Sequence, residues 1–400
     1  MLITVYKVNA MCTFSCEKVH MAKVSEALGC TKKHFMVYGV GKNLQEDQVM
    51  RYLVILFFLT CLPAMGFGAS RPSQQRAISP RKHAVTYTFS GGRFGDNLIS
   101  YLHAKWISYH YGIPLLYKPF PYSDELMLHY VEKSHKTFQH RYKKSISIKK
   151  EKDLHIKARH APTLFVLTYF PESAWERKHS RNGTKNGTEH WHYLPTNWED
   201  PGFRKILKKV IYPVNTREKY TLPADCITVA LHIRRGGGMD TEHTFRHAPL
   251  KFPQDNFYIA QLRWLAKFFA PQKLYVHIFT DDDNPGKMQE VYEKALKGLP
   301  IEFNSRKEGN KHNVNVLEDF FALTQFDCSI HGESNFPVTA GKICDYLVEI
   351  EPTKCHWRKN TLIIDEVLRC VRKKQLKKYL SQESIREILR KYKQQIHVIP

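Results

Sequence analysis

An apolar segment that runs directly into two arginines and three glycines constrains this chain most. Residues 227–233 (Ile-Thr-Val-Ala-Leu-His-Ile) are followed by Arg234, Arg235 and the glycines at 236–238. The apolar run predicts a buried strand, and the glycines predict a turn where that strand ends. At such a turn, backbone N–H groups can approach an anion, and a guanidinium can donate two parallel hydrogen bonds. A plain surface turn is the simpler alternative, but His232 and the three glycines favour a phosphate site.

Strand-like and helix-like segments alternate over two stretches of the chain. In the first, a strand at 85–89 leads through the glycine turn 90–97 into a helix, and 112–117 predicts the next strand. In the second, strands are expected at 227–233, 274–279, 301–303 and 328–330, with helices near 254–269, 316–326 and 341–348. This alternation predicts an α/β fold with parallel sheets. Three polar turns, Arg-Arg-Gly, Thr-Asp-Asp and Ser-Asn-Phe, would then line one crevice at the carboxyl edge of a sheet.

The net charge of +23 restricts the classes of partner. Such an excess suits nucleic acid, an anionic membrane surface or anionic small ligands such as sugar nucleotides. The basic residues gather at 133–159 and at 372–378, and the second group lies in a segment, 351–400, that we expect to be helical, with a solvated basic face. Zinc-ligand spacing, RNA-binding aromatic motifs and basic zippers are absent from the sequence, so specific nucleic-acid binding is not expected.

Residues 50–69 have the order of a secretory signal. Arg51 precedes the apolar run 52–59, and small residues follow at 64–69. This order predicts a signal peptide or an uncleaved anchor, with a buried core helix as the alternative. Met50 would then be the initiator, residues 1–49 an upstream extension, and 70–84 a linker. The expected location is a membrane or a secretory lumen (the endoplasmic reticulum or Golgi) in a eukaryote, and the cytoplasmic side of a membrane in a bacterium.

Cysteines and glycosylation motifs leave the compartment open. Five cysteines follow residue 69, without paired metal-ligand spacing, so one disulfide, two or none are all compatible with the sequence. Sequons begin at Asn182 and Asn186, and they have meaning only in a eukaryotic secretory pathway.

Four motifs together resemble one enzyme superfamily. The segments at 92–97, 232–236, 279–282 and 317–336 lie in the order and at about the spacing found in GDP-fucosyltransferases of the α-1,2, α-1,6 and protein-O class. The resemblance covers roughly residues 85–350 and is thin between 120 and 220.

The resemblance implies a GT-B fold, in which two Rossmann-like domains face each other across a cleft. It places an acceptor-side domain at 85–215 and a GDP-sugar domain at 216–350. The implied reaction moves a sugar, with L-fucose expected, from a GDP-sugar to a glycan or protein acceptor. It inverts the anomeric centre and needs no metal and no cofactor. A metal site at 281–283 stays open as an alternative.

The resemblance also implies roles for individual residues. Arg235 would clamp the pyrophosphate, and Asp96 or Asn97 would meet the sugar from the opposite domain, so these three form the expected catalytic set. The residues expected to bind the donor are Gly95, His232, Arg234, Arg235, Asp281, Asp282, Ser334, Asn335 and Phe336. A clamp of this kind accelerates transfer because the departing GDP gains negative charge in the transition state.

The chain also departs from the motifs of this superfamily. Two further glycines and Met239 separate Arg-Arg-Gly from the first acidic residue, Asp240, and Pro337 stands where a tryptophan commonly follows the Ser-Phe motif. These departures concern the sugar and the acceptor more than the nucleotide. The alternative from another class is a noncatalytic basic protein that binds nucleic acid or acidic membranes, with a steep salt dependence and no nucleotide preference.

Overall fold

The structure is a computed structural model that describes residues 82–148, 153–154, 161–169, 196–215, 220–236, 241–306 and 314–399. The chain divides between Gln75 and Arg76 into two units, and every described residue lies in the second. The expectations for 1–49, for the signal at 50–69, for both sequons and for the glycine-rich stretch 237–240 therefore lie outside the described residues.

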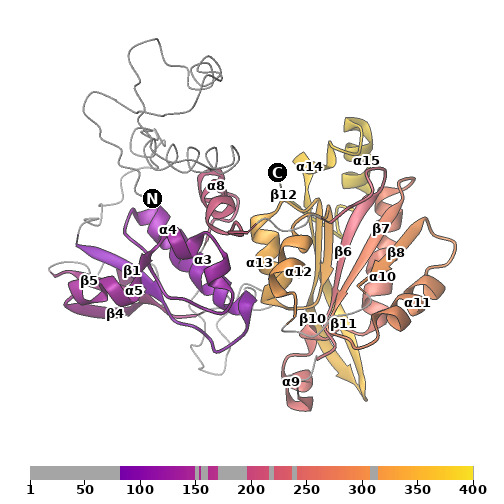
Figure 1. The fold of residues 1–400 in the computed structure, drawn as a ribbon. Helices are drawn as coiled ribbons and strands as arrows, with labels where there is room; N and C mark the ends of the chain where they lie inside the picture. The colour runs from indigo at the N-terminus through magenta and orange to yellow at the C-terminus, as the bar shows by residue number, and fades with distance from the viewer. Residues whose placement is uncertain are drawn as a thin grey trace, which may run out of the picture. The chain divides into compact units, whose positions relative to one another are not determined.

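A three-stranded parallel sheet forms the N-terminal part of the described chain (Figure 1). Its order is β1-β5-β4, made of β1 (His83–Tyr87), β5 (Thr163–Leu167) and β4 (Lys144–Ile148). Two short strands, β2 (Leu116–Tyr117) and β3 (Lys133–Ser134), pair beside it. The shorter helical elements of this region are η1 (Ser123–Glu125), α4 (Leu128–Val131), α5 (His135–Phe138), η2 (Gln139–Arg141) and α8 (Pro201–Val210).

The long helix of this region, α3 (Phe94–Tyr111), begins directly after the glycine turn. At its start, the Asp96 side chain accepts a hydrogen bond from the backbone N–H of Arg93, the N-cap residue. The helix ends at Gly112, whose φ of +65° is a left-handed conformation that glycine adopts without strain. The strand, turn and helix predicted at 85–109 are therefore confirmed, with boundaries shifted by a few residues.

The C-terminal part is built on a seven-stranded sheet of order β12-β11-β10-β9-β6-β7-β8. The strands are β6 (Ile227–Ile233), β7 (Leu274–Thr280), β8 (Ile301–Ser305), β9 (Cys328–His331), β10 (Val348–Arg358), β11 (Thr361–Arg372) and β12 (His397–Ile399). All neighbouring strands are parallel except β10 and β11, which form an antiparallel hairpin. The expected parallel α/β pattern is thus confirmed.

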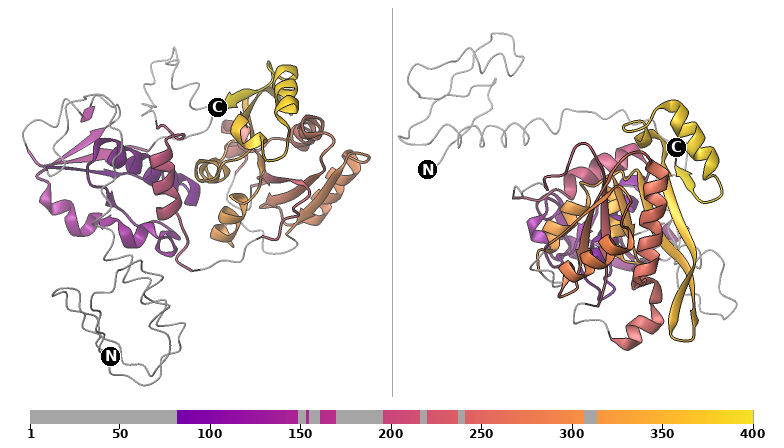
Figure 2. Two further views of the ribbon diagram at one scale, coloured as in Figure 1. Left: turned by 90° about the horizontal axis from the view of Figure 1, so that it is seen from above. Right: turned by 90° about the vertical axis from the view of Figure 1, so that its right-hand side faces the viewer.

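Helices cover both faces of this sheet (Figures 1 and 2). Along β7, Val276 and Ile278 belong to one buried cluster and Tyr275 and Phe279 to another, as expected when alternate side chains point to opposite faces. The helical elements are α9 (Glu242–His247), η3 (Pro249–Lys251), α10 (Asp255–Phe269), α11 (Pro285–Ala295), α12 (Val316–Leu323), α13 (Asn335–Ile343), α14 (Lys373–Leu376) and α15 (Gln382–Lys391).

The expectation of a helical segment at 351–400 is wrong for its first part. Residues 348–372 form the β10–β11 hairpin, which turns at Lys359 with a φ of +54°. The predicted boundary at 350 therefore falls inside a strand of the same sheet. The basic tail after this hairpin is helical in α14 and α15, where Leu376 and Ile385 are fully buried. Among the described residues, no helix has the length and apolarity to cross a membrane.

The two sheets share buried contacts through their helices. Helix α3 packs against α13, and one hydrophobic cluster contains Leu98 and Leu102 of α3 together with Phe320 of α12 and Ala340 of α13. Because α13 begins where β9 ends, this packing brings the glycine turn before α3 to the carboxyl edge of the seven-stranded sheet.

Candidate functional site

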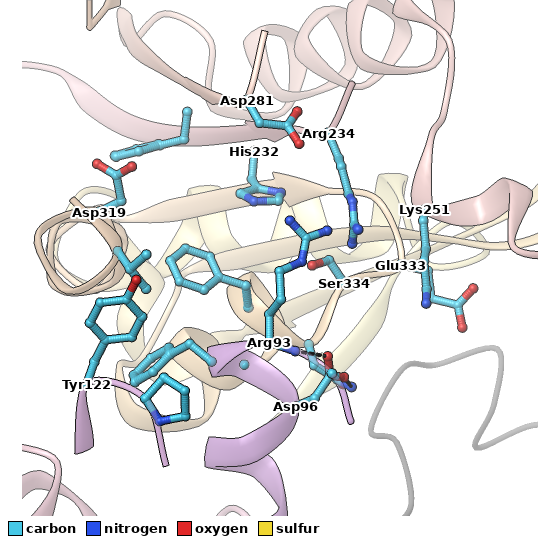
Figure 3. A pocket seen from close by; sticks show the side chains of 18 of the residues that line it. Arg93, Asp96, Tyr122, His232, Arg234, Lys251, Asp281, Asp319, Glu333 and Ser334 are labelled. Atoms are coloured by element: carbon cyan, nitrogen blue, oxygen red, sulfur yellow. Dashed lines mark hydrogen bonds between the residues drawn. The ribbon is translucent and has the colours of Figure 1, made fainter. Parts of the chain in front are cut away.

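A cavity of about 460 Å³ opens at this edge of the sheet (Figure 3). That volume lies in the range of small-molecule sites. Its walls come from the turn before α3, the ends of β6, β7 and β9, and the start of α13. Three polar turns that the sequence placed on one crevice therefore meet, and the glycine turn of the first sheet joins them.

The starts of α3 and α13 meet at this cavity. A Cβ added to Gly95 would lie 2.6 Å from the backbone nitrogen of Phe336, so only glycine allows the two backbones to approach this closely. The N-cap residues are Arg93 and Ser334, and both line the cavity. Free N–H groups and the helix dipole make each N-terminus attractive to an anion.

Asp96 ties the two helix starts together. One carboxylate oxygen, Oδ1, accepts hydrogen bonds from Asn335 Nδ2 at 2.7 Å and from the Tyr169 hydroxyl at 3.0 Å. The other, Oδ2, accepts from the backbone N–H of Arg93 at 3.2 Å. Asn335 Nδ2 also donates to the Tyr169 hydroxyl at 2.9 Å. Asp96 therefore holds α3, α13 and the chain after β5 in one arrangement.

Three cationic side chains from separate parts of the chain line the cavity: Arg93, Arg234 and Lys251. In Figure 3 the guanidinium groups of Arg93 and Arg234 point toward the same space beside Ser334. Arg234 also lies over the ring of Phe252, 5.3 Å from its centroid, which fixes the direction of the guanidinium. Three cations thus lie next to two helix N-termini, on a cavity that is also lined by the carboxylates of Asp96, Asp281, Asp319 and Glu333.

The two adjacent arginines point to different places. Arg235 does not line this cavity, because its guanidinium pairs with Asp255 and donates to the Pro253 carbonyl. Its backbone N–H donates to Asp281. The structure therefore puts Arg234 on the cavity wall and Arg235 outside it, which corrects the expected placement of the pair. The catalytic role of Arg235 stays a prediction that the structure does not favour.

The other expected site residues divide in the same way. Those that line the cavity are Gly95, Asp96, His232, Arg234, Asp281, Ser334, Asn335 and Phe336. Asn97 is buried and its side-chain amide lies 3.4 Å from the Gly92 carbonyl oxygen, so it stabilises the turn and does not reach the cavity. Asp282 also lies off the cavity wall, because its carboxylate accepts from the backbone N–H of Asn284 before α11.

His232 is a neutral group in the wall. Burial of the ring and the neighbouring charge of His331 lower the pKa of His232 to about 3. Its Nδ1 atom has no hydrogen-bond partner within the described part of the chain. The ring lies 5.9 Å from that of Phe336. His232 can thus form a hydrogen bond with a ligand but carries no charge at neutral pH.

Sequence reasoning missed several lining residues, among them Arg93, Tyr122, Lys251, Asp319 and Glu333. Arg93 belongs to the glycine turn at 90–97, and Asp319 belongs to the motif at 317–336. Their positions within these motifs indicated that both could reach the site. Burial raises the pKa of Asp319 to about 6, although Arg306, 2.7 Å away, acts in the opposite direction. Lys251 lies on the short η3 element, and the sequence held no signal for it.

Metal ligands do not gather in the described ranges, where no group of three or more His, Cys, Asp or Glu side chains is arranged to hold a metal ion. The expectation that the reaction needs no metal stays a prediction.

No protein-family model and no curated protein sequence matches the chain. Solved structures that resemble it include POFUT1 in complex with GDP-fucose, with 12% identity, a TM-score of 0.35, and coverage of 68% of this chain and 96% of that one. A mutant of Arabidopsis thaliana FUT1 in complex with GDP has 12% identity, a TM-score of 0.38, and coverage of 78% and 79%. POFUT1 in complex with GDP has 11% identity, a TM-score of 0.34, and coverage of 66% and 95%. Similarity at this level assigns no role to any residue of this chain.

Proposed function

We propose that the protein is a glycosyltransferase that moves L-fucose from GDP-fucose to a glycan or protein acceptor with inversion. The observation that carries this proposal is the meeting of Arg93, Arg234, Lys251 and two helix N-termini on one cavity. A dianionic pyrophosphate matches these groups in charge and in hydrogen-bond donors. The four motifs in superfamily order agree with the same assignment, and a GT-B arrangement of domains at 85–215 and 216–350 belongs to the proposal.

The cationic side chains and the two helix N-termini support departure of the nucleotide. When the bond from the anomeric carbon to the β-phosphate oxygen breaks, negative charge builds on that oxygen. Fixed guanidinium groups and helix N–H groups stabilise this charge more in the transition state than in the ground state. The proton of the acceptor hydroxyl needs a base, and Asp96 and Glu333 are two of the four carboxylates that line the same cavity.

Asp319 supports guanine as the base of the donor. Its carboxylate, whose Oδ1 atom pairs with Arg306, lines the cavity together with Phe279 and Phe336, whose rings can face a nucleobase. Guanine presents two adjacent donors, N1–H and the N2 amino group, to a carboxylate. Uracil, cytosine and adenine lack that pair of donors. The neutral His232 adds a hydrogen-bonding group beside the base.

The proposal keeps the membrane or secretory location, because residues 50–69 have the order of a signal peptide or anchor. The donor and the catalytic unit would then meet in a lumen supplied with nucleotide sugars, or on the cytoplasmic side of a bacterial membrane. Fractionation of cells that produce the full chain tests this, and recovery only in the soluble cytosol would contradict it.

Transfer itself is tested with radiolabelled GDP-fucose, an array of glycans and a mixture of glycoproteins as acceptors. We expect label on an acceptor, with the anomeric configuration opposite to that of the donor. Transfer from UDP-sugars in preference to GDP-fucose would contradict the proposed donor. Binding of nucleic acid or acidic vesicles that falls steeply with salt, without nucleotide preference, would favour the noncatalytic alternative.

A further inference from the structure

A second cavity, of about 240 Å³, adjoins the first, and Arg234 lines both. It lies between the turn after β6, the α9–η3 segment and the tip of the β10–β11 hairpin. The residues that line it are Arg234, Arg235, Phe245, Pro249, Phe252, Gln254, Trp357, Asn360 and Leu362. Of its aromatic residues, only Phe252, over which Arg234 lies, takes part in the site described above.

The lining of this cavity combines aromatic faces, two side-chain amides and the guanidinium groups of Arg234 and Arg235. Phe245 and Phe252 pack together with ring centroids 4.3 Å apart, and Trp357 on the hairpin tip is 46% exposed. Gln254 and Asn360 add amide groups. Among the described residues that line the cavity none is a carboxylate, and Asp255 behind it is paired with Arg235. With two arginines and no carboxylate the cavity does not suit a cation. Its aromatic faces and its hydrogen-bond donors suit a ligand with apolar faces and several hydroxyl oxygens that can accept hydrogen bonds.

The volume and the position of the second cavity limit which ligands it can bind. The cavity has about half the volume of the first one, so a nucleotide sugar would not fit in it, whereas a single pyranose ring would. A pyranose has C–H faces that pack on aromatic rings and hydroxyl groups that bond to amides and guanidinium groups. A ligand here would lie across Arg234 from the pyrophosphate-binding wall.

We propose that this second cavity binds one pyranose ring of the acceptor, with Trp357 as its stacking surface. The inference rests on the proposed function, because the bound sugar is an acceptor only if the protein transfers a sugar to it. The sugar-binding property itself can be measured without any turnover. Trp357 then determines acceptor affinity and leaves donor affinity unchanged.

The test uses the full chain and three probes: the methyl glycosides of β-D-galactose, N-acetyl-β-D-glucosamine and α-D-mannose. Saturation-transfer NMR detects their binding, and calorimetric titration measures GDP binding to the same protein samples. The variants are Trp357→Ala, Trp357→Phe and Tyr130→Ala. Tyr130 is a matched control, because it is an aromatic side chain 63% exposed on α4 that lines neither cavity.

We expect saturation transfer to at least one glycoside. Trp357→Ala should reduce that glycoside's affinity roughly tenfold, as for other central aromatic contacts. Trp357→Phe should retain most of it, Tyr130→Ala should retain all of it, and GDP affinity should stay within about twofold in each variant.

Three results would overturn the inference. They are no binding of any glycoside, an equal loss in Tyr130→Ala, and a GDP affinity that falls with Trp357→Ala, which would make the cavity part of the nucleotide site. If a glycoside binds through Trp357 while GDP does not bind at all, the proposed donor is wrong but the sugar site stands.

Discussion

At the scale of single residues, the adjacent arginines show what a sequence motif leaves undetermined. Neighbouring side chains in an extended segment point in opposite directions, so a pair after a strand places one residue in the crevice and the other outside it. The motif alone suggested Arg235 as the clamp. The structure puts Arg234 on the cavity wall and pairs Arg235 with Asp255. The presence of an arginine at the site could be predicted. Which of the two it is depends on the contact of Arg234 with Phe252 and on the ion pair of Arg235 with Asp255.

We therefore expect Arg234→Ala to reduce transfer by about a hundredfold to a thousandfold, the usual effect of losing a group that stabilises transition-state charge. Arg234→Lys should restore little, because an ammonium cannot form the bidentate contact. Arg235→Ala should lower thermal stability, since its partner Asp255 is left at a partly exposed site, and it should reduce transfer less than Arg234→Ala does, because Arg235 lines only the second cavity. Rates and melting temperatures of the three variants check this, and the reverse order of activities would restore Arg235 as the clamp.

A second residue-scale prediction concerns pH. With a pKa of about 6, Asp319 is ionised at pH 7 and becomes protonated as the pH falls through 6. A protonated carboxyl cannot accept both donors of guanine, so GDP affinity should fall below pH 6. The phosphate of GDP titrates near the same pH, and calorimetry with Asp319→Asn corrects for that. If the wild-type protein and the variant show identical pH profiles, Asp319 does not contact the base.

At the scale of elements, the contact between α3 and α13 depends on one glycine. Gly95→Ala would put a methyl group 2.6 Å from the backbone of Phe336 and force the two helix starts apart. We expect at least about a tenfold loss of GDP affinity together with a lower melting temperature, because a fixed backbone must move. Nucleotide titration and thermal unfolding measure the two effects.

Gly286→Ala is the matched control, because Gly286 is also the second residue of its helix, α11, and its nearest neighbour atom would lie 3.9 Å away. This substitution should be neutral or stabilise the fold by about 0.4–1 kcal/mol. Equal behaviour of the two variants would show that the close approach at Gly95 has no consequence for the site.

The same scale shows which elements could be predicted. Strands β6, β7 and β9 are buried on both faces, and the sequence displayed β6 and β7 as nearly continuous apolar runs. The β10–β11 hairpin was missed because its exposed half carries polar residues such as Lys354, His356 and Arg358, which hide the alternation. The turn at Lys359 and Asn360 was the one local signal for it. The second cavity, which depends on that hairpin, could therefore not have been predicted.

At the scale of the whole molecule, the net charge of +23 did not identify the ligand. A large positive charge attracts many kinds of anion and does not select one of them. The specific information comes from where three cations meet two helix N-termini, which needs contact between the two sheets. That contact joins residues such as Asp96 and Asn335, far apart in the sequence, and no local pattern reveals it.

A whole-molecule prediction concerns metal. The three cations on the cavity wall can neutralise a pyrophosphate, so removal of divalent metal with EDTA should leave transfer essentially unchanged. The assay is run before and after chelation, with Mg²⁺ and Mn²⁺ added back. Complete loss that either metal reverses would indicate a metal site, and 281–283 would be its first candidate.

The central claim is that this cavity binds GDP, and a thermal-shift comparison of GDP, UDP, CDP and ADP tests it most directly. Each nucleotide is added to the full chain and to its Arg234→Ala variant. GDP should raise the melting temperature of the wild-type protein most, because binding at a hundredfold excess over Kd adds about 2.7 kcal/mol to the unfolding free energy. That shift should be largely lost in Arg234→Ala. Equal shifts with all four nucleotides, no shift with any, or an undiminished GDP shift in Arg234→Ala would contradict the claim.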